Sequence, residues 1–70
     1  MIRQSVGSTN INSIGYDPKS QTLEIEFLSG GIYQYFNVPE SIYNALMATS
    51  SHGSYFRHHI KDQYRWTKIC

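Results

Sequence analysis

Alternating apolar and polar residues predict three β-strands in the first half of the chain. The clearest strand is residues 22–28, where leucine, isoleucine and phenylalanine alternate with two glutamates. Residues 11–16 form a second run, which ends at an Asp-Pro-Lys-Ser sequence typical of a β-turn. Residues 32–36 form a third run behind a Ser-Gly-Gly sequence, whose glycines can adopt the positive φ of a tight hairpin. We therefore expect a three-stranded antiparallel meander.

The register of the second hairpin decides which face of the sheet carries Tyr33 and Tyr35. A two-residue loop places both tyrosines beside Glu24 and Glu26, on a face that we expect to be exposed, where the rings form a stacking platform. A three-residue loop turns both tyrosines into the core, because a slip of one residue exchanges the two faces of a strand. The Ser-Gly-Gly sequence suits either loop, so both placements stay open.

The apolar spacing becomes helical from Pro39 onward, and proline is tolerated in a first helical turn. The apolar face of this first helix consists of Pro39, Ile42, Tyr43, Leu46 and Met47. A second helix begins after Ser50 or Ser51, since either serine can act as its N-cap. Its buried stripe consists of Tyr55, Phe56, His59, Ile60 and Tyr64. Residues 65–70 either continue this helix or fray.

These elements predict an α+β fold of the order β-β-β-α-α, with both helices packed on one face of the sheet. Seventy residues allow one domain, 1–70, whose core we place at about residues 6–64. The single cysteine, Cys70, permits no intrachain disulfide and no cysteine-based zinc site. A core of this size also favours a homo-oligomer, because a second copy would cover apolar surface that one copy leaves exposed.

No stretch has the apolar length of a secretion signal or of a membrane span. Together with the single thiol, this pattern predicts a cytoplasmic protein with no membrane partner.

The charge and the aromatic content narrow the choice of ligands. A net charge of +1 disfavours tight binding to long duplexes, for which phosphate neutralisation supplies most of the affinity. The charge is uneven, because residues 36–70 carry four basic and two acidic side chains whereas residues 1–35 carry two basic and three acidic ones. The chain also contains six tyrosines, three phenylalanines and one tryptophan. Aromatic rings near a modest positive charge are typical of surfaces that bind single strands or nucleotides.

Four basic residues near the end of the chain are spaced four, four and three residues apart: Arg57, Lys61, Arg65 and Lys68. On a continuous helix they lie within about 80° of arc, with Tyr64 at the border of this stripe. Aligned cations beside an aromatic ring can hold phosphates while a base stacks on the ring. The same spacing is also typical of a solvated helix face, so both readings stay open.

The turn around Ser51 is a candidate phosphate site, because free backbone N–H groups and small hydroxyl side chains gather there. A plain helix N-cap explains the same serine without a ligand. His58 and His59 cannot ligate one metal ion from adjacent helical positions, since their side chains diverge by about 100°. No nucleophile elbow and no phosphate-binding glycine loop is present. We therefore expect neither catalysis nor a metal or cofactor.

Several short motifs in a fixed order resemble the KTSC domain family. They are Ile14-Gly15-Tyr16-Asp17, Leu23 with Phe27, Gly30 or Gly31, Tyr33-Gln34-Tyr35, Val38-Pro39, and Ser51-x-Gly53-x-Tyr55-Phe56 with Ile60 and Tyr64. The resemblance covers about residues 6–64. A KTSC domain occurs at the C-terminus of some lysyl-tRNA synthetases and also stands alone as a short bacterial protein. The resemblance implies binding to RNA and carries over no catalytic residue.

We predict a non-enzymatic binding module whose ligand is RNA, single-stranded DNA or a nucleotide-like anion. The residues predicted to carry the binding are Arg57, Lys61, Arg65, Tyr64, Ser51, Tyr33 and Tyr35. One alternative is a protein–protein interaction module that uses exposed tyrosines and arginines. A further alternative is an oligomer that sequesters a small signalling nucleotide between its subunits.

Overall fold

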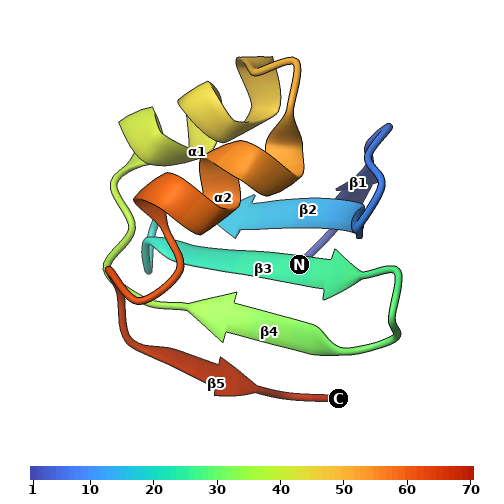
Figure 1. Cartoon of the computed structure of the whole chain (residues 1–70). Coiled ribbons are helices and arrows are strands. Elements are labelled where there is room, and N and C mark those ends of the chain that lie inside the picture. The colour runs from blue at the N-terminus through green and yellow to red at the C-terminus, as the bar shows by residue number, and fades with distance from the viewer.

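Five strands pair antiparallel in the order of the chain and form one sheet. The structure is a computed structural model that describes residues 1–70. The strands are β1 (Arg3–Ser5), β2 (Ile11–Asp17), β3 (Thr22–Phe27), β4 (Ile32–Tyr35) and β5 (Trp66–Lys68). Two helices, α1 (Glu40–Ala48) and α2 (His52–His59), follow β4 and pack on one face of the sheet (Figure 1). The predicted α+β class, with an antiparallel sheet and two helices, is confirmed.

The predicted number of three strands is wrong, because the sheet gains an edge strand on each side. Both edge strands are only three residues long, and the residues of β5 are all exposed. A strand this short shows no alternation that a sequence pattern can detect. Each edge strand forms by pairing with its neighbour: Gln4 of β1 pairs with Ile14 of β2, and Trp66 of β5 pairs with Tyr35 of β4. The tail after Tyr64 therefore neither continues the second helix nor frays.

The hairpin between β3 and β4 has a three-residue loop. The Phe27 N–H donates a 2.9 Å hydrogen bond to the carbonyl of Gly31, which leaves residues 28–30 in the turn. Gly30 has φ 110°, a conformation that favours glycine. In this register Ile25 pairs with Tyr33, and Tyr35 pairs with Leu23. Of the two registers that the sequence left open, the structure has the one that turns both tyrosines toward the helices.

The core lies between the helices and the central strands. Its nine buried side chains are Ile11, Ile14, Leu23, Ile25, Tyr35, Val38, Leu46, Phe56 and Ile60. Tyr16 of β2 stacks on Tyr43 of α1, with the ring centroids 4.8 Å apart, and its hydroxyl donates a 2.6 Å hydrogen bond to the Val38 carbonyl. Phe56 of α2 packs edge-on against Tyr35, with their centroids 5.4 Å apart. These contacts hold both helices against the same face of the sheet.

Helix α2 is shorter than the sequence predicts. Its last residue is His59, and Asp62 reverses the chain at φ 64° toward β5. The predicted buried stripe is correct for Phe56 and Ile60, whereas His59 is exposed and stacks on Tyr55 at a centroid distance of 4.4 Å. Neither helix has the length and apolar character that a membrane span requires.

The face of the sheet opposite the helices carries a polar network around Glu24. We expected this glutamate to be exposed, but only 5% of it is accessible to solvent. Arg3 of β1 forms an ion pair with its carboxylate, and the Gln34 amide donates a 2.8 Å hydrogen bond to it. Arg3 also donates a 2.9 Å hydrogen bond to the Ser13 hydroxyl. The edge strand that the sequence pattern did not predict is therefore the element that buries this carboxylate.

Candidate functional site

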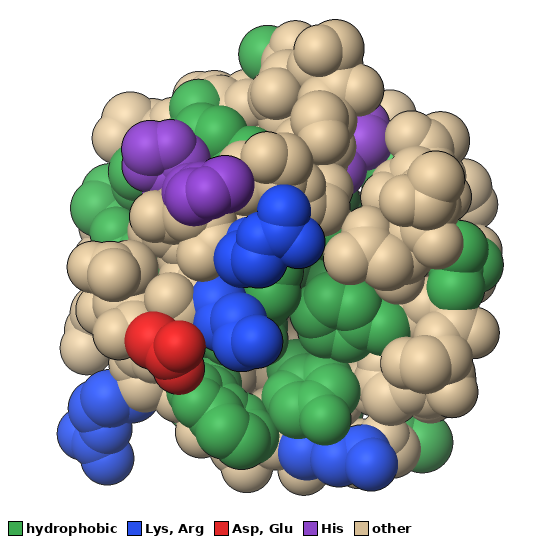
Figure 2. Space-filling model, in the orientation of Figure 1, with side chains coloured by type: hydrophobic (Ala, Val, Ile, Leu, Met, Phe, Trp, Pro, Cys, Tyr) green, Lys and Arg blue, Asp and Glu red, His purple; other side chains and the backbone are tan.

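The helices cover the β2 side of the sheet, and β4 and β5 extend beyond them (Figure 1). A cleft of about 420 Å³ lies there, between α2, the turn that follows it and the strands. Its lining residues are Asn10, Phe27, Ser29, Tyr33, Tyr35, Gly53, Phe56, Arg57, Lys61, Asp62 and Trp66. Figure 2 shows this face of the molecule, on which basic side chains border a group of hydrophobic side chains. We call this surface the basic-aromatic cleft.

Arg57 and Lys61, two of the basic residues predicted to bind the ligand, line the basic-aromatic cleft. They are four residues apart, and Lys61 lies in the turn just after α2, where its N–H donates a 2.9 Å hydrogen bond to the Phe56 carbonyl and closes the end of the helix. Both side chains are exposed, and neither forms an ion pair, because both ion pairs of the chain involve Arg3. Their charges are therefore free to act on an anionic ligand.

The predicted basic stripe on one continuous helix is wrong, because α2 ends before Tyr64 and Arg65. These two residues lie in a shallow hollow next to the cleft, and that hollow also includes Asp62 and Trp66. Lys68 lies in β5, where it pairs with Tyr33 and shares its face of the sheet. The four cations thus come from a helix, a turn and a strand, and only Arg57 and Lys61 line the same cavity.

Aromatic rings form the floor of the cleft. Tyr33 lies 5.5 Å from Trp66 and 5.5 Å from Phe27, measured between ring centroids. Trp66 is 53% exposed, so much of its ring is available to a ligand. Trp66 is not among the residues predicted to bind a ligand, because the pattern of residues 65–70 predicts no single structure. The one available signal was that Trp66 is the only tryptophan of the chain and follows the basic residues.

Tyr35 reaches the cleft from below. Tyr35 is only 5% exposed, and its hydroxyl has no hydrogen-bond partner in the chain. Every polar side-chain atom that is fully enclosed in this chain does have a partner, so the Tyr35 hydroxyl is not fully enclosed. The hydroxyl therefore borders the solvent of the cleft that Tyr35 lines. Burial raises the pKa of this hydroxyl to about 12, with smaller contributions from Tyr33 and from the Asp62 carboxylate. The hydroxyl thus stays protonated and can donate a hydrogen bond at neutral pH.

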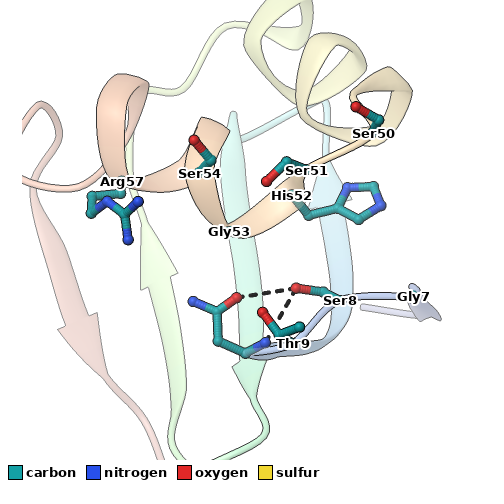
Figure 3. A pocket seen from close by; sticks show the side chains of 10 residues that line it. Gly7, Ser8, Thr9, Ser50, Ser51, His52, Gly53, Ser54 and Arg57 are labelled. Carbon is teal, nitrogen blue, oxygen red and sulfur yellow. Dashed lines mark hydrogen bonds between the residues drawn. The ribbon is translucent and has the colours of Figure 1, made fainter.

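A second cavity, of about 510 Å³, adjoins the cleft at the start of α2 and is lined by polar residues and glycines (Figure 3). Ser51 stands there at the N-cap position, but its side chain makes no capping hydrogen bond. Asn10, Gly53 and Arg57 line both cavities, so the two spaces are neighbours. A Cβ atom on Gly53 would meet the exposed Asn10 side chain, which would have to move to make room for it.

The sequence model of the KTSC domain family matches residues 7–64 of this chain. These residues include β2 to β4, both helices and most of the lining of the cleft. The chain belongs to the KTSC domain family. The matched range contains Tyr33, Tyr35, Arg57 and Lys61, whereas Trp66 and β5 lie beyond it.

Relatives of this KTSC domain occur as short proteins and as parts of longer ones. A protein of Stutzerimonas stutzeri is 41% identical over 70 residues, and the alignment covers 99% of both chains. A lysine–tRNA ligase of a Nostoc species is 41% identical over 59 residues, which are 84% of this chain and 10% of the ligase. The crystal structure of a KTSC domain protein from Yersinia pestis superimposes with a TM-score of 0.96 and 43% identity, over 99% of this chain and 97% of that one.

Proposed function

We propose that this KTSC domain binds single-stranded nucleic acid, with RNA as the preferred ligand, through the basic-aromatic cleft and without catalysing a reaction. The proposal rests on one observation. Arg57 and Lys61, which form no ion pair, line the same cavity as the exposed ring of Trp66. Cations that follow a phosphate backbone and rings on which bases stack are the two components of single-strand binding sites.

The size and charge of the cleft favour a single strand over a duplex. The cleft holds only two free cations, and the net charge of the chain is +1, so phosphate contacts alone supply little affinity. A stacked base adds about 1–3 kcal/mol, and stacking requires an unpaired base. The acidic side chains of Glu24 and Glu26 lie on the opposite face of the sheet, where Arg3 pairs with both carboxylates. They therefore do not oppose a phosphate in the cleft.

The relatives favour RNA over DNA. Segments of three lysine–tRNA ligases match 84% of this chain at 36–41% identity, and tRNA is part of the name of those enzymes. A related domain within an enzyme named for tRNA supports RNA as the ligand of this chain.

The experiment uses the only tryptophan of the chain as its probe. Because Trp66 lines the cleft, its fluorescence will be quenched when an unstructured, uridine-rich RNA oligonucleotide stacks there. Arg57 and Lys61 together predict a slope of about −1.4 when the logarithm of the binding constant is plotted against the logarithm of the salt concentration. A duplex of the same length is expected to bind more weakly. Absence of quenching at low salt would exclude the proposal.

Charge-matched variants separate the cleft from the rest of the surface. Arg57→Gln and Lys61→Gln are each expected to weaken binding and to reduce the salt slope by about 0.7. Lys19→Gln is the control, since Lys19 is exposed in the turn after β2 and does not line the cleft. Equal effects of all three variants would indicate general electrostatics rather than a site. Binding of a protein partner with little dependence on salt would instead support an interaction module.

A further inference from the structure

The basic-aromatic cleft contains one acidic residue, Asp62. Its side chain is exposed and forms no ion pair, although Arg57 and Lys61 line the same cleft. A free carboxylate works against phosphate binding, because like charges repel each other. It is, however, well suited to accept hydrogen bonds from the N–H groups of a base.

A second polar group faces the same cleft from an otherwise buried side chain. The Tyr35 hydroxyl has no hydrogen-bond partner in the chain, although Tyr35 is only 5% exposed. Tyr35 and Asp62 line the same cleft, and the Asp62 carboxylate is the smallest of the three causes that raise the pKa of this hydroxyl. Because no fully enclosed polar side-chain atom of the chain is unpaired, this hydroxyl reaches the solvent of the cleft, where a ligand can accept a hydrogen bond from it. The hydroxyl offers a donor, and Asp62 offers an acceptor.

From this pair we propose that the cleft is specific for guanine within a single strand, an inference that rests on the nucleic-acid binding proposed above. The base stacks on Trp66, and its N1–H and its exocyclic amino group donate to the Asp62 carboxylate. The Tyr35 hydroxyl donates to the guanine O6 atom, which is a hydrogen-bond acceptor. Arg57 and Lys61 hold the adjoining phosphates.

The other three bases present a poorer edge to this pair. Adenine and cytosine each carry a ring nitrogen that accepts hydrogen bonds where guanine has its N1–H, so the carboxylate of Asp62 would face a lone pair. Uracil has one N–H on this edge, whereas guanine offers two adjacent donors. A site whose polar groups are left unpaired by the wrong ligand discriminates strongly against it. A cleft that offers one donor and one carboxylate acceptor thus suits guanine better than the other bases.

The backbone of Asp62 suggests the variant that tests its carboxylate. Asp62 has φ 64°, a left-handed conformation that asparagine and aspartate adopt more readily than other side chains. The turn therefore explains the presence of either residue, and Asp62→Asn keeps the turn while it removes the charge. Glu40→Gln is the matched control, because Glu40 is an exposed acidic residue at the start of α1 and lies outside the cleft.

The test measures fluorescence anisotropy of end-labelled uridine hexamers in which one central base is guanine, adenine, cytosine or uracil. The wild-type chain is expected to bind the guanine hexamer about tenfold more tightly than the others, the usual discrimination of a bidentate contact. Asp62→Asn is expected to bring this ratio close to one, while the affinity for the all-uridine hexamer stays equal or rises. Tyr35→Phe, which keeps the ring, is expected to lower the ratio in part. Glu40→Gln is expected to leave it unchanged.

The outcomes separate this inference from the proposed function. Equal binding of all four hexamers would overturn guanine specificity and leave single-strand binding intact. A preference for another base, or a ratio that Asp62→Asn and Glu40→Gln change equally, would also overturn it. If no hexamer binds at low salt, both proposals fail together.

Discussion

Replacing Arg3 by methionine tests whether the network on the uncovered face stabilises the fold. Methionine keeps an unbranched stem of similar length but removes the charge and the donors that reach Glu24 and Ser13. Breaking a fully buried ion pair costs about 3–5 kcal/mol, because the remaining charge stays buried without a partner. The Arg3 side chain is 28% exposed, and Glu24 keeps its bond from Gln34, so we expect a smaller loss of about 2 kcal/mol.

A loss of this size is large for such a short chain, whose unfolding free energy is on the order of 5 kcal/mol. It should also depend on pH. Burial of Glu24 raises its pKa, but hydrogen bonds from Gln34 and Arg3 and the charge of Arg3 outweigh burial, so the pKa lies below its ordinary value. The stabilisation is therefore fully present above the ordinary carboxyl pKa of about 4.3 and is lost as the pH falls through the lower pKa of the folded state.

Urea unfolding followed by circular dichroism at pH 7 and at pH 3 measures this difference. Arg3→Met is expected to lower the free energy of unfolding by about 2 kcal/mol at pH 7 and by less at pH 3, because the contribution of Glu24 falls as the pH drops below the ordinary carboxyl pKa toward the lower pKa of the folded state. Arg65→Met is the control, since Arg65 is exposed and forms no ion pair, and it should change stability by less than about 0.5 kcal/mol. Equal losses for Arg3→Met at both pH values would refute the electrostatic explanation and point to packing alone.

Three further predictions follow from backbone geometry and burial. Gly30→Ala should lower the free energy of unfolding by about 1–3 kcal/mol in urea, because an alanine at φ 110° is strained. Gly15→Ala should cost about as much, since its Cβ would lie 2.8 Å from the carbonyl oxygen of Ile2 and β1 would have to move; unchanged urea midpoints would contradict both expectations. Above pH 10 the unfolded chain loses the Tyr35 proton first, because burial raises the pKa of the folded hydroxyl to about 12, so stability should fall between about pH 10 and 12. Tyr35→Phe should reduce this fall in alkaline thermal melts, and an identical pH profile would count against the burial argument.

Part of the basic-aromatic cleft could be predicted from the sequence. Arg57 and Lys61 are four residues apart, a spacing that puts two side chains on one side of a helix. The structure places both on the same cleft, although Lys61 lies in the turn just after α2. Arg65 and Tyr64 were assigned to the same stripe on the assumption that the helix continues. The turn at Asp62 ends that continuity and moves them to a neighbouring hollow. Trp66 takes their place beside the cations, and no local pattern indicates this exchange.

The sequence by itself determined the α+β class, the three central strands and the two helices, because each of these elements is long enough to repeat its apolar period. Only the tertiary structure decided the two edge strands, the burial of Glu24 and the position of Trp66. A three-residue strand has no period of its own, and it becomes a strand because a neighbouring backbone offers unpaired N–H and C=O groups. The hairpin register was likewise decided by which face of β4 packs against the helices, because a shift of one residue in the pairing exchanges the two faces of the strand.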